Sequence, residues 1–193
     1  MKKDLSKTLI PVAVIIFGFA AIFGVGNYLD RNRPELPEGY EDQDLALQGA
    51  RLKGYALGFE GLIADWYWIS SLQYIGDKIL KNPNAKTSLE NLTALNPRLL
   101  YPYLDNATTL DPQFTVAYSY GALVLPAIDR EQAIKLAEKG IENNPNQSFL
   151  YHYLGYIYWK SKDYDKAAEV YARGADLPNA PAFMKLMAAN MKS

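Results

Sequence analysis

The hydrophobic positions divide the chain into two regions. Near the N-terminus an unbroken apolar run contains no charged residue between Lys7 and Asp30. From residue 45 onward, apolar residues recur every three or four positions, which is the spacing of amphipathic helices. No stretch alternates between apolar and polar residues for more than a few positions. The pattern therefore predicts an all-α fold preceded by a single hydrophobic helix.

The apolar run predicts a transmembrane anchor over residues 9–29. As a helix these 21 residues extend roughly 31 Å, about the thickness of the hydrocarbon core of a bilayer. Residues 1–8 form a basic tail, so the positive-inside rule predicts a cytoplasmic N-terminus and a following domain outside the cytoplasm, in the periplasm or its equivalent. The alternative is a cleaved signal peptide that releases a soluble secreted domain, but the run continues past the small residues Gly18 and Ala20.

After the anchor, residues 30–44 are acidic and contain prolines, as expected for an extended tether. Residues 45–113 then show helical periodicity interrupted by glycines and prolines, which predicts helices over 62–80, 87–95 and 99–110. On the first of these an apolar stripe predicts the face that packs into the core. The stripe comprises Leu62, Trp66, Ile69, Leu72, Ile75 and Ile79. Trp68 lies off this stripe, either as an exposed anchor or packed on the broken helix that the glycine-interrupted periodicity predicts over 45–57.

A repeat of fixed period organises the C-terminal half. Three pairs of small residues recur 34 positions apart: Gly121 and Gly155, Ala133 and Ala167, Gly140 and Gly174. Prolines close the units at Pro145 and Pro178. Residues 114–147 and 148–179 are therefore each predicted to form a helix, a short polar turn and a second helix.

The two units resemble the tetratricopeptide repeat (TPR) family in period and residue pattern. The small residues fall at positions where the family has glycine or alanine, and Pro145 closes the first unit. Tyr171 stands at a position where the family has an aromatic residue, whereas the equivalent position of the first unit holds Ala137. The resemblance implies a short solenoid of stacked helical hairpins. Residues 45–113 would form its degenerate N-terminal part and residues 180–193 its C-terminal capping helix.

Glycine inside a hydrophobic helix needs a packing reason, because it costs about 1 kcal/mol relative to alanine. We expect Gly155 in one helix to meet Ala167 in the other where they cross, since small residues let two backbones approach. Tyr151, Tyr158 and Tyr171 would fill the volume beside this crossing.

The resemblance also implies a concave groove lined by the first helix of each unit. The corresponding positions are Thr115, Tyr118, Ala122, Leu125, Phe149, His152, Tyr156 and Trp159. They lack the lysines and asparagines with which some TPR modules clamp terminal carboxylates. An aromatic groove instead suits an apolar or proline-bearing segment, or a helix of a protein partner. Two alternatives stay open: the groove is free, or the chain's own terminal helices fill it.

Little in the composition favours catalysis or cofactor binding. The chain has no cysteine and one histidine, so it offers no thiol chemistry, cysteine-ligated metal or histidine cluster. Its net charge of −1 gives no electrostatic basis for binding nucleic acid. Asp65 and Asp77 are the acids around which an active site would have to form, whereas Asp163 and Asp165 fit turn or capping positions. We expect no enzyme activity, metal or cofactor.

These observations together predict a membrane-anchored scaffold or adaptor that binds protein partners and assembles or holds a complex at a membrane. One alternative is a permanent structural subunit of a larger membrane complex, such as a secretion, pilus or energy-transducing machine. A membrane-bound enzyme is the third alternative.

Overall fold

The computed structural model describes residues 2–32, 49–83 and 91–191. The chain divides into two units, residues 1–41 and 42–193. Every regular element assigned within the described ranges is a helix, as predicted. The expected tether over 30–44 lies almost wholly outside these ranges, as does the first part of the expected helix over 87–95.

The first unit contains one long helix, α1 (Lys2–Arg31). Within it, Ile10–Leu29 has a mean hydropathy of 2.1 and no part of that window is buried within the structure. Pro11 lies inside this helix without ending it. The helix is long and apolar enough to cross a membrane or to serve as a signal sequence.

The second unit begins with α2 (Gly49–Lys53) and α3 (Glu60–Lys81), followed by a short 3-10 helix (Thr93–Leu95) and α4 (Leu100–Leu110). Both α2 and α3 pack against α4. The predicted helix over 99–110 is confirmed, because α4 ends just before Asp111 and Pro112. Of the helix expected over 87–95, the described part forms only the 3-10 turn.

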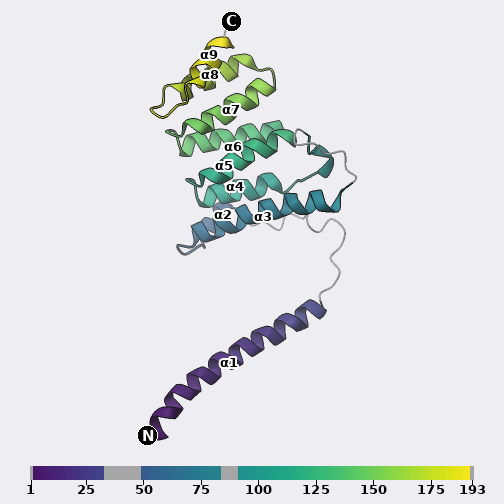
Figure 1. The fold of residues 1–193 in the computed structure, drawn as a ribbon, viewed down its shortest axis with the longest axis vertical. Coiled ribbons are helices and arrows are strands. Elements are labelled where there is room, and N and C mark those ends of the chain that lie inside the picture. The colour runs from purple at the N-terminus through teal and green to yellow at the C-terminus, as the bar shows by residue number, and fades with distance from the viewer. Residues whose placement is uncertain (1, 33–48, 84–90, 192–193) are drawn as a thin grey trace. The chain divides into compact units, whose positions relative to one another are not determined.

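The C-terminal half contains two consecutive helix pairs and a final helix. The first pair is α5 (Thr115–Val124) and α6 (Arg130–Asn143), and the second is α7 (Ser148–Lys160) and α8 (Tyr164–Ala175). The final helix is α9 (Phe183–Asn190), where the capping helix was expected. Each helix packs on the next, so α4 to α9 form a stack that leads from α3 to the C-terminus (Figure 1).

The first helices of the two pairs differ in length because of Pro126. In the first pair α5 ends at Val124 and continues as a 3-10 turn over Leu125–Ala127. In the second pair α7 continues to Lys160, the residue that corresponds to Pro126 one repeat later. Proline has no backbone N–H to donate, so the last turn of α5 cannot keep the α-helical pattern.

The recurring small residues mark sites of close contact between helices. A Cβ atom at Gly155 would lie 2.8 Å from the Tyr171 ring, and its three nearest atoms all belong to that ring. At Gly174 a Cβ would lie 2.5 Å from the Cβ of Tyr151. Gly155 therefore makes room for the ring of Tyr171 on α8, one of the tyrosines expected to fill the volume beside the crossing with Ala167.

The predicted core stripe of α3 is wrong for all but one of its residues. Leu62, Trp66 and Ile69 are at least half exposed, while Ile75 is buried. The face that packs on α4 instead carries Ala64, Tyr67, Ser71 and Tyr74. The reason is that α3 is apolar on two faces, and periodicity alone does not say which face meets a neighbouring helix.

The tyrosines on the buried face of α3 explain the choice. Tyr67 and Tyr74 both pack against Tyr103 of α4, with ring centroids 6.1 Å and 5.8 Å away. The Tyr74 hydroxyl also accepts a hydrogen bond of 3.3 Å from the backbone N–H of Leu99. A tyrosine can thus bury its ring and still form a hydrogen bond through its hydroxyl to the backbone just before α4. A leucine at the same position could not form this bond.

Trp68 is not the exposed anchor that was one of the two environments proposed for it. It is partly buried, and its ring meets Phe114 and Tyr120 edge-on at centroid distances of 5.9 Å and 5.1 Å. Trp68 therefore connects α3 to the beginning of the first repeat unit.

Candidate functional site

Partly exposed aromatic side chains follow one face of α7. We call this surface the α7 aromatic surface; it comprises Phe149, His152, Tyr153, Tyr156 and Trp159. At its C-terminal end Tyr156 is 38% exposed and Trp159 43% exposed, with their ring centroids 5.7 Å apart. The opposite face of α7 carries Leu150, Leu154 and Ile157, all buried. This burial fixes the rotation of the helix and directs the aromatic residues outward.

The other end of this surface is covered by the chain itself. The ring of Phe183, in the first turn of α9, meets His152 edge-on at a centroid distance of 5.0 Å. His152 Nδ1 lies 3.4 Å from the Tyr171 hydroxyl, and burial lowers the pKa of its imidazole, favouring the neutral form. Phe183 thus packs on His152, whereas the rings of Tyr156 and Trp159 stay exposed.

Of the four groove residues predicted in the first unit, Thr115 is half-buried, whereas the other three are core residues. Tyr118 and Leu125 are 0% exposed and Ala122 is buried, so the prediction that they line a groove is wrong for this structure. Tyr118 packs against Gly140 of α6, and its hydroxyl accepts a 3.5 Å hydrogen bond from the Asn143 amide. Its burial raises the pKa of the phenol to about 12.

The residues that define the repeat lie in the interior, with one exception. Gly121, Ala133, Gly140, Gly155, Ala167, Tyr171 and Gly174 are buried. Pro145 is exposed just after α6, and its carbonyl accepts a 3.0 Å hydrogen bond from the Tyr151 hydroxyl. The repeat pattern therefore marks packing positions and the turn between the two units.

The candidate acidic residues do not converge on a site. Asp65 and Asp77 are both exposed on α3. Asp163 precedes α8 but makes no capping hydrogen bond; it pairs instead with Arg130 at 3.8 Å and Lys166 at 3.6 Å. Asp165 lies exposed in the first turn of α8. Within the described ranges, no three His, Asp or Glu side chains are close enough together to hold a metal ion.

A cleft that the sequence did not indicate lies between α6, α7 and α8. It has a volume of about 360 Å³ and mixed charge. Its lining consists of Glu138, Ile141, Glu142, Leu154, Tyr158, Lys166, Glu169, Val170 and Arg173. The Tyr158 hydroxyl donates to Glu138 Oε1 at 3.3 Å. The sequence feature that could have indicated this cleft is the four-residue spacing of charged residues on α6 and α8. Such spacing is also usual on solvated helix faces.

Comparison with known proteins does not assign the chain to a family. No family model matches the sequence, and no curated protein shows significant similarity to it.

Proposed function

We propose that the protein is a membrane-anchored scaffold or adaptor, built from TPR-like helical hairpins, that binds protein partners through the α7 aromatic surface. The role is non-enzymatic. Its mechanism is geometric: α1 holds the domain at a membrane, which raises the effective concentration of the binding surface for partners there.

Contacts that recur at the repeat distance support the TPR-like interpretation. Lys139 of α6 forms a 2.7 Å ion pair with Asp105 of α4, one repeat length earlier in the chain. A Cβ at Gly140 would meet the Leu150 side chain, and a Cβ at Gly174 would meet Met184, the residue that corresponds to Leu150 one repeat later. In this interpretation α9 takes the place that the first helix of a further repeat would occupy.

The observation that carries the proposed binding role is the pair of exposed rings at Tyr156 and Trp159. Tyrosine and tryptophan are enriched among the residues that dominate protein–protein binding energy, because they bury a large apolar area at little entropic cost. The two rings pack together at 5.7 Å, which preorganises them on a rigid helix. A partner helix, or an apolar segment containing proline, fits such a surface.

The proposed membrane orientation places the N-terminus in the cytoplasm and the helical domain outside it. The basic residues before the apolar run, Lys2, Lys3 and Lys7, support this orientation.

The test is a double variant, Tyr156→Ala with Trp159→Ala, in the full chain. We expect capture of cross-linked partners from native membranes to fall at least roughly tenfold, since each lost aromatic anchor is worth about 1–2 kcal/mol or more. The melting temperature should stay near that of the wild type because both side chains project outward.

Tyr164→Ala provides the control, since Tyr164 is a comparably exposed tyrosine on α8 outside the proposed surface. Unchanged capture in the double variant, or loss of its fold, would refute the assignment. A partner recovered at constant stoichiometry would identify the chain as a permanent subunit of a larger complex.

A further inference from the structure

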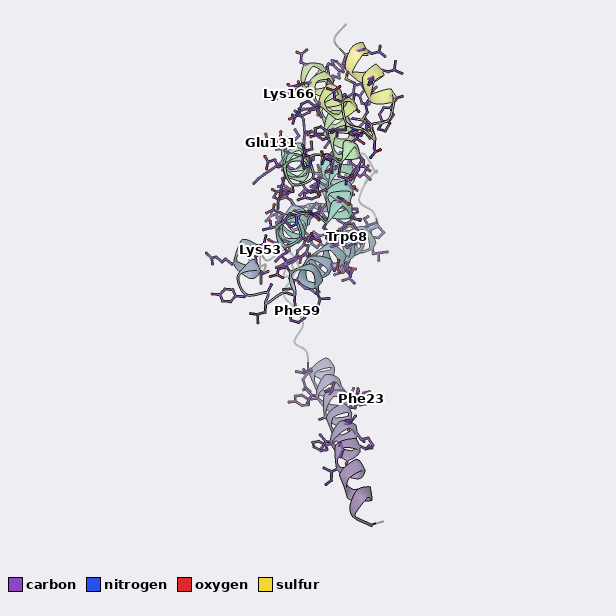
Figure 2. The ribbon with its side chains drawn as sticks, turned by 90° about the vertical axis from the view of Figure 1, so that its left-hand side faces the viewer. Phe23, Lys53, Phe59, Trp68, Glu131 and Lys166 are labelled. Carbon is purple, nitrogen blue, oxygen red and sulfur yellow. The ribbon has the colours of Figure 1, made fainter. Side chains whose placement is uncertain are left out.

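Large apolar side chains project into solvent at the end of the domain formed by α2 and α3. We call these residues the α2–α3 end patch. It comprises Tyr55, Leu57, Phe59, Leu62 and Trp66, which are 59% to 89% exposed. In Figure 2, Phe59 lies at the end of the domain distant from Lys166 of α8. Exposed apolar groups gathered in this way mark a surface that meets another apolar phase.

The connection between α2 and α3 is built to hold these side chains outward. Leu57 and Gly58 have left-handed backbone conformations, with φ of 51° and 90°. The turn is closed by hydrogen bonds from the Tyr55 N–H to Leu52 and from the Phe59 N–H to Ala56, of 2.9 Å and 2.8 Å. A leucine in the left-handed region is unfavourable, so the turn retains a strained residue that is also 89% exposed.

Helix α3 continues the patch along its outer face. Leu62, Trp66, Ile69 and Leu80 lie opposite the face that packs on α4, and all four are at least half exposed. A helix with apolar residues on both faces is normally covered on both. Within the described part of the chain, no helix covers this outer face of α3.

The types of residue in and beside the patch indicate a lipid surface. Tryptophan, tyrosine, phenylalanine and leucine are the side chains that favour the boundary between headgroups and acyl chains. Arg51 and Lys53 of α2, both exposed, are the only charged residues described between Gly49 and Phe59, and they suit anionic headgroups. Asp65 and Asp77 on α3 would keep this helix at headgroup depth, because a carboxylate is costly within hydrocarbon.

The chain also confines the patch to the vicinity of a bilayer if α1 spans one. Sixteen residues separate Asn32 from Gly49. Even a fully extended chain of this length covers at most about 60 Å. A patch of modest intrinsic affinity would therefore meet the bilayer at high effective concentration.

We propose that the α2–α3 end patch docks on the surface of the bilayer that α1 spans and inserts Leu57, Phe59 and Leu62 at the boundary between headgroups and acyl chains. This docking orients the helical domain on the membrane. It rests on the proposed membrane anchor but is independent of any protein partner.

The absence of cysteine in the chain permits a direct test by site-directed spin labelling. The full-length chain is labelled at Leu62→Cys and reconstituted into vesicles of phosphatidylethanolamine and phosphatidylglycerol. Accessibility of the label to oxygen and to a water-soluble nickel chelate is then measured by electron paramagnetic resonance. Leu186→Cys on α9 is the matched control, because Leu186 is 63% exposed and Leu62 is 67% exposed.

We expect the label at position 62 to be accessible to oxygen and protected from nickel, and the label at 186 to be accessible to nickel. Adding Leu57→Asp and Phe59→Asp should return the label at 62 to water. A water-exposed label at 62 in the unsubstituted patch would overturn the proposal, as would spin–spin broadening from a second copy of the chain. Extraction of the same vesicles with alkaline carbonate separates failure of the docking proposal from failure of the proposed membrane anchor, because loss of the protein from the vesicles would refute the anchor itself.

Discussion

Individual small residues set how closely the helices of the C-terminal half approach. Gly174 of α8 faces the Cβ of Tyr151 on α7, an atom fixed to the backbone that cannot rotate away. By contrast, Gly76 of α3 has no atom within 4 Å of the position a Cβ would take, apart from its own helix and chain neighbours. Two glycines inside helices thus have opposite roles: one is needed for packing, and the other only lowers helix propensity.

We predict that Gly174→Ala destabilises the domain by about 1–2 kcal/mol, because overpacking outweighs the gain of roughly 1 kcal/mol in helix propensity. Gly76→Ala should stabilise it by up to about 1 kcal/mol. Denaturation of the full chain in detergent, followed by circular dichroism, measures both changes. Equal effects of the two substitutions would contradict the assigned contact between α7 and α8.

At the scale of elements, the two helix pairs begin their second helices differently despite equivalent aspartates. Asp129 accepts hydrogen bonds from the N–H groups of Glu131 and Gln132, at 2.9 Å and 3.1 Å. Asp163, the equivalent residue of the second pair, makes no such bond and forms ion pairs with Arg130 and Lys166. The backbone of Asp129 is extended, with φ of −148° and ψ of 110°, which is the geometry that lets a side chain cap a helix.

We expect Asp129→Ala to lower the stability of the domain by about 1 kcal/mol, since it leaves two N–H groups of α6 without their side-chain acceptor. Asp163→Ala should cost about 0.5 kcal/mol or less, because the ion pairs it removes are partly exposed. Thermal melting of both variants provides the comparison, and raising the salt concentration should reduce a larger share of the effect at Asp163 than of the effect at Asp129. A larger loss at Asp163 would contradict the assignment of Asp129 as the true cap.

At the scale of the whole molecule, the chain joins a hydrophobic helix to a helical domain with two distinct apolar surfaces. The α7 aromatic surface lies in the C-terminal half, and the α2–α3 end patch lies at the end of the domain away from α9 (Figure 2). We propose that the first binds proteins and the second binds lipid. Separate surfaces allow variants that impair one activity and leave the other intact.

For the molecule as a whole we predict that the full chain resists extraction from membranes by alkaline carbonate and that its helical domain lies outside the cytoplasm. The apolar run of α1 is long enough to span a bilayer, and the preceding lysines favour the cytoplasm. A single cysteine introduced by Lys166→Cys, at an exposed position on α8, should react with a membrane-impermeant maleimide in intact cells. Labelling that requires cell lysis would reverse the proposed orientation.

The sequence by itself determined the features that depend on local order along the chain. Apolar length alone predicted α1, and helical spacing with proline stops predicted α4 and the four helices from α5 to α8. Recurrence of glycine and alanine at the repeat distance indicated which positions pack closely. These features follow from backbone geometry and side-chain volume, which act between residues near one another in sequence.

Only the tertiary structure decided which apolar face of each helix is covered. Leu62 and Trp66 had the spacing of core residues, yet tyrosines on the other face of α3 pack on α4. Tyr118 is buried while His152, its counterpart in the second unit, is partly exposed, in keeping with the shortening of α5 before Pro126. Periodicity specifies that a face is apolar, but burial depends on the shape and polarity of the neighbour that meets it, and that neighbour comes from elsewhere in the chain.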